Sequence, residues 1–350
     1  MLPLSVWPFS PGRNRMIYIR TDMNSKIATG HVMRCLAIAD AAKALGECTT
    51  FILADYQACE LVAEKGHKAI VLETQWDDMD NELPKLLPIL KSKNIKKLLI
   101  DSYQVTENYL KILSSYVITI YMDDKNSFVY PVHALICYAN YWKKFKYTSL
   151  YEKTKLFLGL EYVPLRKEFY NCREKMIKKE AEEILLLSGG TDPFGMLKNI
   201  LSAMDKSKYK KINVICGRYD SSYEILQDQY KFFHNIHIYQ AVTNIEDYMN
   251  TADIAVSAGG STLYELCVCG TPTISYSFAD NQLDNVYQFQ KDGIIEYAGD
   301  AGQDKTVTKI ISLLDEYQRD VILRTQRSKK MQALIDGKGA SRIVKAINEI

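Results

Sequence analysis

Short runs of β-branched and other apolar residues alternate along this chain with longer amphipathic segments. This alternation is typical of a parallel sheet whose faces are covered by helices. In the first half, strands are expected near 16–21, 48–53, 68–72, 96–101, 117–121 and 133–136. Helices are expected there near 30–45, 57–65, 80–91 and 106–114. The pattern therefore predicts an α/β domain.

The alternation stops between Tyr138 and Glu182, a stretch rich in Tyr, Lys and Glu, and restarts at Ile184. In the second half, strands are expected near 184–187, 212–216, 236–240, 254–257, 272–276 and 294–297. Helices are expected near 195–206, 221–231, 261–269, 282–291 and 304–316. Two α/β units in tandem imply a cleft between them, and ligands of such sheets bind beyond the carboxyl ends of the strands.

The expected organisation has four parts. Residues 1–15 form a leader that we expect to be disordered, and 16–165 form an N-terminal Rossmann-like domain. Residues 180–317 form a C-terminal Rossmann-like domain, and 318–350 form a charged helical tail that can pack back onto the first domain.

Composition excludes several classes of protein. The 350 residues are 47% hydrophobic, which is enough for two cores, and the formal net charge of +2 calls for no nucleic-acid or membrane partner. No apolar run is long enough to span a bilayer, and the first 15 residues lack the features of a signal peptide. The eight cysteines include no Cys-x-x-Cys pair, which favours free thiols in the cytoplasm.

The first candidate site is Thr29-Gly30-His31-Val32-Met33-Arg34, between the first strand and the first helix. Thr29 is expected as the N-cap, which places His31 in the first helical turn at the carboxyl edge of the sheet. The positive end of the helix dipole disfavours an imidazolium there, and a neutral imidazole suits a general base. From this motif alone, a histidine that only caps or packs the helix is an equally good interpretation.

Two glycine turns follow apolar strands in the second half, in Ser188-Gly189-Gly190-Thr191-Asp192-Pro193 and in Ser257-Ala258-Gly259-Gly260-Ser261-Thr262. Paired glycines let the backbone approach a ligand, and the N–H groups at the following helix start can hold a diphosphate. Glu265 lies on the same helix face as Ser261, where its carboxylate can accept hydrogen bonds from ribose hydroxyls. Ordinary strand-to-helix turns would explain each motif by itself.

Two further polar motifs follow strands. Asn281 and Gln282, at the start of an expected helix, can bind hydroxyl or acetamido groups, although an Asx turn explains them equally well. Asp123 and Asp124 are interpreted as a solvated turn. No second acidic or histidine cluster lies nearby in the sequence, so no metal site is predicted.

Taken together, the motifs resemble the PseG family, the UDP-2,4-diacetamido-2,4,6-trideoxy-β-L-altropyranose hydrolases of pseudaminic acid biosynthesis, which are related to MurG. The resemblance runs from about Met16 to Asp300. It rests on Arg20-Thr21-Asp22, Thr29-Gly30-His31-Val32-Met33-Arg34-Cys35-Leu36-Ala37, Asp101-Ser102-Tyr103, Leu165-Arg166-Lys167-Glu168-Phe169, Ser188-Gly189-Gly190-Thr191-Asp192-Pro193, Gly260-Ser261-Thr262 with Glu265, and Asp280-Asn281-Gln282.

The resemblance implies a GT-B architecture in which His31 activates the water and the C-terminal domain holds UDP. Glu265 would bind the uridine ribose, and the turns at 189–190 and 259–260 would bind the diphosphate. The substrate-binding residues it implies are Arg20, Gly30, Arg34, Tyr103, Arg166, Gly189, Gly190, Gly260, Ser261, Thr262, Glu265, Asn281 and Gln282. Family members carry a glycine where this chain has Ala28, a difference that bears on the sugar used.

The implied reaction is hydrolysis of that nucleotide sugar by water attack at the anomeric carbon. It breaks the C–O bond with inversion, releases UDP, and needs no metal or other cofactor. We expect a cytoplasmic monomer whose partner is the UDP-sugar. Two alternatives are a UDP-sugar-dependent GT-B glycosyltransferase and a non-catalytic nucleotide-sugar-binding protein. Residues 16–135 show no basic and apolar patch for a membrane-bound acceptor, and His31 argues against a binding protein without catalysis.

Overall fold

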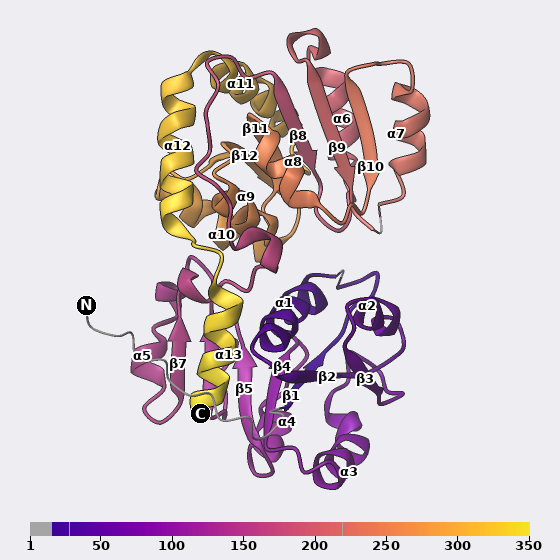
Figure 1. Ribbon diagram of the computed structural model, residues 1–350, viewed down its shortest axis with the longest axis vertical. Helices are drawn as coiled ribbons and strands as arrows, with labels where there is room; N and C mark the ends of the chain where they lie inside the picture. The colour runs from indigo at the N-terminus through magenta and orange to yellow at the C-terminus, as the bar shows by residue number, and fades with distance from the viewer. Residues whose placement is uncertain (1–15, 28, 219) are drawn as a thin grey trace, which may run out of the picture.

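The computed structural model describes residues 16–27, 29–218 and 220–350. It contains two parallel sheets in two domains, one above the other in Figure 1. The expectations for residues 1–15 and for Ala28 lie outside the described residues.

The sheet of the N-terminal domain has seven parallel strands in the order β3-β2-β1-β4-β5-β6-β7. They are β1 (Met16–Thr21), β2 (Cys48–Leu53), β3 (Lys68–Val71), β4 (Lys97–Asp101), β5 (Ile118–Met122), β6 (Ala134–Cys137) and β7 (Lys155–Leu158). The helices between them are α1 (Gly30–Ala44), α2 (Cys59–Glu64), α3 (Leu83–Ser92), α4 (Glu107–Ser114) and α5 (Tyr147–Leu150).

Alternating side chains of these strands supply two apolar cores. In β4, Leu99 packs on the face covered by α1, while Leu98 and Ile100 pack on the face covered by α3 and α4. Strands buried on both faces read as continuous apolar runs, and this is why the sequence indicated them so clearly. Helix α1 ends at Ala44, and the chain turns away at Gly46, whose φ of +79° favours a residue without a side chain.

The sheet of the C-terminal domain has six parallel strands in the order β10-β9-β8-β11-β12-β13. They are β8 (Glu183–Leu187), β9 (Lys211–Cys216), β10 (Ile236–Gln240), β11 (Ile254–Ala258), β12 (Thr273–Ser277) and β13 (Glu296–Asp300). The helices of this domain are α6 (Met196–Ala203), α7 (Tyr223–Tyr230), α8 (Ile245–Thr251), α9 (Thr262–Cys269), α10 (Asp280–Lys291) and α11 (Lys305–Arg319).

In each sheet, later strands are added on both sides of the first strand of that domain. The chain adds β2 and β3 on one side of β1 and returns to add β4 on the other, and β8 lies in the same way between β9 and β11. The loops after such a pair of strands diverge and leave a crevice at the carboxyl edge, which is where ligands of this architecture bind. In the first domain this crevice lies after β1 and β4, and in the second after β8 and β11.

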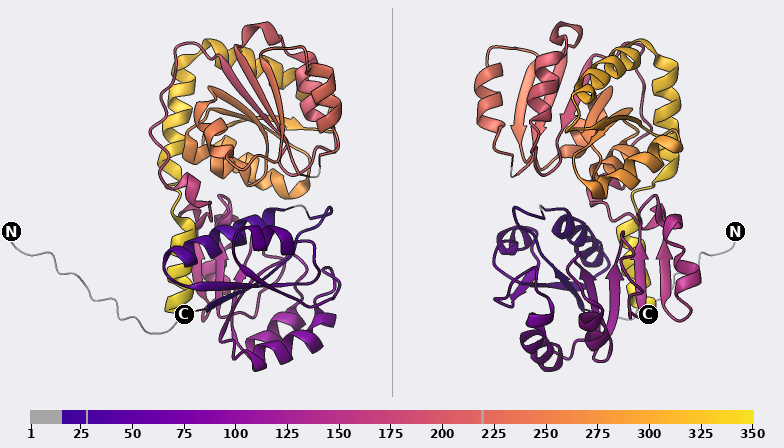
Figure 2. Two further views of the ribbon diagram at one scale, coloured as in Figure 1. Left: turned by 45° about the vertical axis from the view of Figure 1, so that its right-hand side comes forward. Right: turned by 180° about the vertical axis from the view of Figure 1, so that it is seen from behind.

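The last two helices pack on different domains. Helix α12 (Val321–Leu334) packs on α9, and α13 (Gly339–Glu349) crosses back to pack on α1, as both views of Figure 2 allow the reader to follow. A side chain at Gly339 would place its Cβ 2.1 Å from the carbonyl oxygen of Val163, so α13 begins in close contact with the segment that joins the domains. The tail expected at 318–350 is therefore divided between the two domains.

Three elements were not expected from the sequence. Helix α5 and strand β7 lie between Tyr138 and Glu182, where the alternation was expected to stop, and α8 precedes β11 in a polar segment. All eight cysteines are free thiols, and five of them are buried. Throughout the described ranges, no helix has the length and apolar character needed to cross a membrane.

Candidate active site

The crevice of the N-terminal domain holds His31 and Asp101. His31 lies in the first turn of α1, and Asp101 is the fully buried last residue of β4. The imidazole Nδ1 and the carboxylate Oδ1 are 2.7 Å apart. Arg34 Nη2 also lies 3.0 Å from Nδ1, but this nitrogen donates to the same carboxylate oxygen. Because that carboxylate only accepts hydrogen bonds and is the nearer partner, we assign the imidazole proton to Nδ1, which leaves the lone pair on Nε2. With 8% of its surface exposed, His31 can still present that nitrogen to a small ligand.

Arg34 fixes the carboxylate of Asp101 from the next turn of α1. Its Nε donates to Oδ2 at 2.6 Å, and its Nη2 donates to Oδ1. Burial alone would raise the pKa of Asp101, but Arg34 and His31 together hold it well below its ordinary value. The carboxylate therefore stays charged and can stabilise the imidazolium that forms when His31 accepts a proton.

Tyr103 and Asp124 complete the wall beside the imidazole. The ring of Tyr103 meets that of His31 edge to face, with centroids 4.6 Å apart, and its hydroxyl donates to Asp124 Oδ2 at 2.8 Å. Burial and the nearby Asp124 charge raise the pKa of Tyr103, which keeps the phenol protonated. The ring thus limits the positions that the imidazole can adopt.

The interpretation of Asp123 and Asp124 as a solvated turn is wrong. Asp123 is 4% exposed and accepts hydrogen bonds from the backbone of Lys125 and Asn126 and from the hydroxyls of Tyr130 and Tyr147. It locks the loop after β5, and this loop places Asp124 near Arg34 and Tyr103. Among the described residues, no group of three or more His, Cys, Asp or Glu side chains could hold a metal ion.

A small pocket opens on the Asp101 side of His31. It has a volume of about 10 Å³ and is lined by residues that include Asp22, Trp76, Ser102 and Gln104. That volume is about enough for one water molecule. Trp76 and Gln104 were not singled out from the sequence, because neither stands in a recognisable motif.

A larger pocket of about 50 Å³ lies between the domains. It brings together five of the residues expected in the site, namely Gly30, Arg34, Arg166, Ser261 and Glu265. Arg166 Nη2 lies 3.1 Å from Glu265 Oε1, while Arg166 Nε is buried and lacks a hydrogen-bond partner among the described residues. Burial raises the pKa of Glu265, against the opposing charge of Arg166.

The two glycine turns lie side by side at the carboxyl edge of the second sheet, because β8 and β11 are neighbours. Gly189 has a φ of +80°. A Cβ at Gly217, after β9, would lie 2.2 Å from the carbonyl oxygen of Gly189, so a third glycine makes room for the first turn. Ser261 is exposed, and Thr262 begins α9. The sequence analysis did not single out Gly217.

Three of the residues expected to bind the substrate lie outside both pockets. Arg20 is fully buried, and its guanidinium contacts Glu82, Asp22 and the backbone of Thr21, so it does not reach either pocket. Gln282 Oε1 accepts from the backbone N–H of Phe278 at 3.0 Å and so supports the loop before α10. Asn281 is exposed in the first turn of α10 and does not line either pocket.

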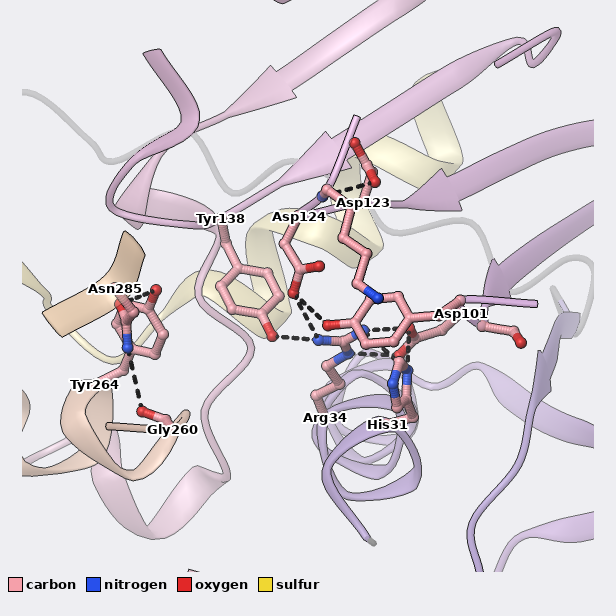
Figure 3. A network of polar contacts seen from close by, with 12 residues as sticks. His31, Arg34, Asp101, Asp123, Asp124, Tyr138, Gly260, Tyr264 and Asn285 are labelled. Atoms are coloured by element: carbon pink, nitrogen blue, oxygen red, sulfur yellow. Dashed lines mark hydrogen bonds and ion pairs between the residues drawn. The ribbon is translucent and has the colours of Figure 1, made fainter. Parts of the chain in front are cut away.

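A network of contacts connects the two crevices through Tyr138, Tyr264 and Asn285, none of which was expected in the site (Figure 3). Arg34 Nη1 donates to the Tyr138 hydroxyl at 2.7 Å, and the Tyr138 ring meets the Tyr264 ring edge to face. The Tyr264 hydroxyl donates to Asn285, which donates in turn to the carbonyl oxygens of Gly259 and Gly260. These residues come from loops and helices far apart in the chain, and no local pattern marks them.

Comparison with known sequences finds a family model that matches the second domain. Residues 184–346 match the glycosyltransferase family 28 C-terminal domain. The uncharacterized protein MJ1062 of Methanocaldococcus jannaschii is 28% identical over 276 residues, which are 74% of this chain and 54% of that protein. The spore coat polysaccharide biosynthesis protein SpsG of Bacillus subtilis is 26% identical over 56% of this chain and 59% of its own. The chain thus spans little more than half the length of these two relatives.

A shorter match links the chain to a transferase. The UDP-N-acetylglucosamine–N-acetylmuramyl-(pentapeptide) pyrophosphoryl-undecaprenol N-acetylglucosamine transferase of Helicobacter pylori is 32% identical over 37% of this chain and 39% of its own. Among solved structures, MurG of Acinetobacter baumannii superposes with a TM-score of 0.69 over 96% of this chain and all of that one, at 11% identity. The chain has the GT-B fold, as expected from its motifs.

Proposed function

We propose that this chain is an enzyme that acts on a UDP-sugar and that His31 deprotonates the nucleophile that displaces UDP. The observation that carries the proposal is the His31–Asp101 pair, 2.7 Å apart, in the crevice opposite the glycine turns of the second domain. In such a pair the carboxylate orients the imidazole and stabilises the proton that it accepts, which is what a general base requires. The family 28 match of the second domain supports a nucleotide-sugar substrate.

In the proposed reaction, the nucleophile's oxygen attacks the anomeric carbon as His31 Nε2 accepts its proton. The bond between that carbon and the phosphate oxygen breaks, and UDP leaves with the electron pair. Attack from the face opposite UDP inverts the anomeric carbon. Asp101 stabilises the imidazolium, and the N–H groups at the start of α9 stabilise the charge that grows on the diphosphate.

Glycosyl transfer to an acceptor hydroxyl is the reaction that the comparisons favour. The family matched by the second domain is one of glycosyltransferases, and the Helicobacter pylori relative is named for transfer from UDP-N-acetylglucosamine. In this version of the proposal, His31 deprotonates the acceptor hydroxyl. Glu265 and Arg166, in the pocket between the domains, would hold the nucleotide part of the donor.

Hydrolysis is the second candidate, and one observation favours it. The pocket beside His31 has a volume of about 10 Å³, which is about enough for one water molecule. The substrate would then be the diacetamido-trideoxy sugar nucleotide suggested by the resemblance of the motifs. Tyr103, whose ring covers the imidazole, would lie against that sugar.

Release of UDP with and without an acceptor separates these reactions. The purified chain would be given UDP-N-acetylglucosamine and the UDP-diacetamido-trideoxy-altrose, each alone and then with candidate acceptor glycans. UDP that appears only with acceptor establishes transfer, and UDP that appears at the same rate without it establishes hydrolysis. If UDP binds but is released under neither condition, the proposal of an enzyme is rejected in favour of a binding protein.

A further inference from the structure

Asn285, on α10, lies behind the glycine turn of the second domain and has no role in the chemistry proposed above. It is 5% exposed, and its amide is fully engaged. Nδ2 donates to the carbonyl oxygens of Gly259 at 3.0 Å and Gly260 at 3.3 Å, and Oδ1 accepts from the Tyr264 hydroxyl at 2.9 Å. Two carbonyl partners can only accept, so this orientation of the amide follows from its contacts.

Those two bonds determine where the turn directs its N–H groups. In a trans peptide the N–H points opposite to the C=O, so carbonyls held toward Asn285 direct the N–H groups of Gly260 and Ser261 away from α10. Neither N–H donates to another protein atom in the part of the chain that the structure describes. Ser261 lines the pocket between the domains. Two unpaired donors at a helix start are suited to bind a diphosphate.

Asn140 of the N-terminal domain makes hydrogen bonds to Asn285 and to its partner Tyr264. The backbone N–H of Asn140 donates to the Tyr264 hydroxyl at 3.4 Å, and its side-chain Nδ2 donates to the carbonyl oxygen of Asn285 at 3.0 Å. Asn140 lies in the loop after β6, two residues beyond Tyr138, whose ring packs edge to face on Tyr264 and whose hydroxyl accepts from Arg34 (Figure 3). One continuous set of contacts therefore joins the proposed base to the proposed phosphate turn.

We propose that Asn285 is a positioning residue for the leaving group, because it orients the Gly259–Gly260 turn. Through Tyr264 and Asn140, this orientation depends on contact between the two domains. This inference rests on the proposed function. The diphosphate site is complete only when the N-terminal domain, which carries the base, is in place. Bond breaking is thereby coupled to the presence of the nucleophile, because donors aimed at the leaving oxygen are effective only while they are held in position.

Three variants of the full chain test the proposal through turnover and through UDP affinity measured by calorimetry. Asn285→Asp keeps the size of the side chain but cannot donate to the two carbonyls, and we expect kcat to fall on the order of 100-fold with weaker UDP binding. Tyr264→Phe removes one hydroxyl and should lower kcat about tenfold. Asn140→Ala should lower kcat by a similar factor of about ten, with UDP affinity changed less than about twofold.

Gln288→Ala is the matched control, since its amide lies on the same helix and bonds only Asp292. A purely structural role would lower the melting temperature of the variants and leave kcat per folded molecule unchanged, and that result would overturn the proposal. Wild-type turnover in Asn285→Asp would also overturn it. If the wild-type chain releases no UDP from any donor, the proposed function fails, but weakened UDP binding by Asn285→Asp would still support the positioning of the turn.

Discussion

The carboxyl edges of the two sheets share a topology and differ in chemistry. After β1, β4 and β5, the first domain places ionisable side chains in a network of His31, Arg34, Asp101 and Asp124. After β8 and β11, the second domain places glycine turns, and the neutral amide of Asn285 holds the turn after β11. A side chain of defined tautomer suits proton transfer, while backbone N–H groups suit an anion that must bind and leave.

The two edges also differ in the kind of residue on which each depends. In the first domain the proposed function rests on the chemistry of individual side chains. In the second it rests on the absence of side chains, as at Gly217, where a Cβ would meet the backbone of the neighbouring turn. The predictions below test this division, beginning with the largest expected effect.

Replacement of His31 by Ala should abolish most turnover and leave UDP affinity unchanged, because the base and the nucleotide site belong to different domains. We expect a loss on the order of 1000-fold in kcat, within the range for removal of a general base. His234→Ala, at an exposed position of the second domain, is the control. Wild-type turnover in His31→Ala would remove the base from the mechanism.

Replacement of Asp101 by Asn tests whether the carboxylate sets the tautomer. The amide can donate to Nδ1, which would move the imidazole proton to Nε2, so kcat should fall by roughly 100-fold or more while UDP binding stays the same. Nitrogen-15 NMR of the imidazole would report the tautomer directly. An unchanged proton on Nδ1 in the variant would contradict the assigned role.

Glu265→Gln should weaken UDP binding by about tenfold, because a charged acceptor of hydroxyl hydrogen bonds is lost. The comparison ligand is 2′-deoxy-UDP, which lacks one of the hydroxyls that Glu265 would bind. If the variant loses as much affinity for the deoxy ligand as for UDP, the carboxylate does not bind that hydroxyl.

The variants Gly217→Ala and Gly30→Ala test how tightly the backbone is packed at the two edges. A Cβ at Gly217 would lie 2.2 Å from a carbonyl oxygen, whereas a Cβ at Gly30 meets nothing within 4 Å. We expect Gly217→Ala to reduce the free energy of unfolding by about 1–3 kcal/mol and to weaken UDP binding severalfold. Gly30→Ala should leave the free energy of unfolding within about 0.5 kcal/mol of the wild-type value. Equal effects at both positions would show that the second edge is not more tightly packed.

The smallest effect concerns acid stability. Arg34 and His31 hold the pKa of Asp101 below its value in the unfolded chain, which is about 3.9 for an aspartate. The ionised carboxylate therefore stabilises the fold at higher pH, and this contribution is lost as the pH falls below about 5. Urea unfolding between pH 6 and pH 3 should show a steeper loss of stability in the wild-type chain than in Asp101→Asn. Parallel curves would contradict the lowered pKa.

The strands of both cores were predictable because each is an apolar run with glycine or polar residues after it, as in β8 before Ser188. Strand β7 was missed because it is short, lies at the edge of the sheet and is only partly buried, so its pattern is weak. Helix α8 spans only seven residues, and Asn244 at its N-cap makes no side-chain capping bond, so the acidic first turn is a weak signal for a helix.

The sequence by itself determined the order of the elements, the position of His31 at a helix start and the two glycine turns, since each depends on neighbours within a few residues. Only the tertiary structure decided that Asp101 orients His31 and that Arg20 is bound to Glu82. It also decided that contacts of Asn140, Tyr264 and Asn285 join the two domains. Those contacts join residues 21 to 145 positions apart. They arise from strand order and domain packing, which no local periodicity encodes.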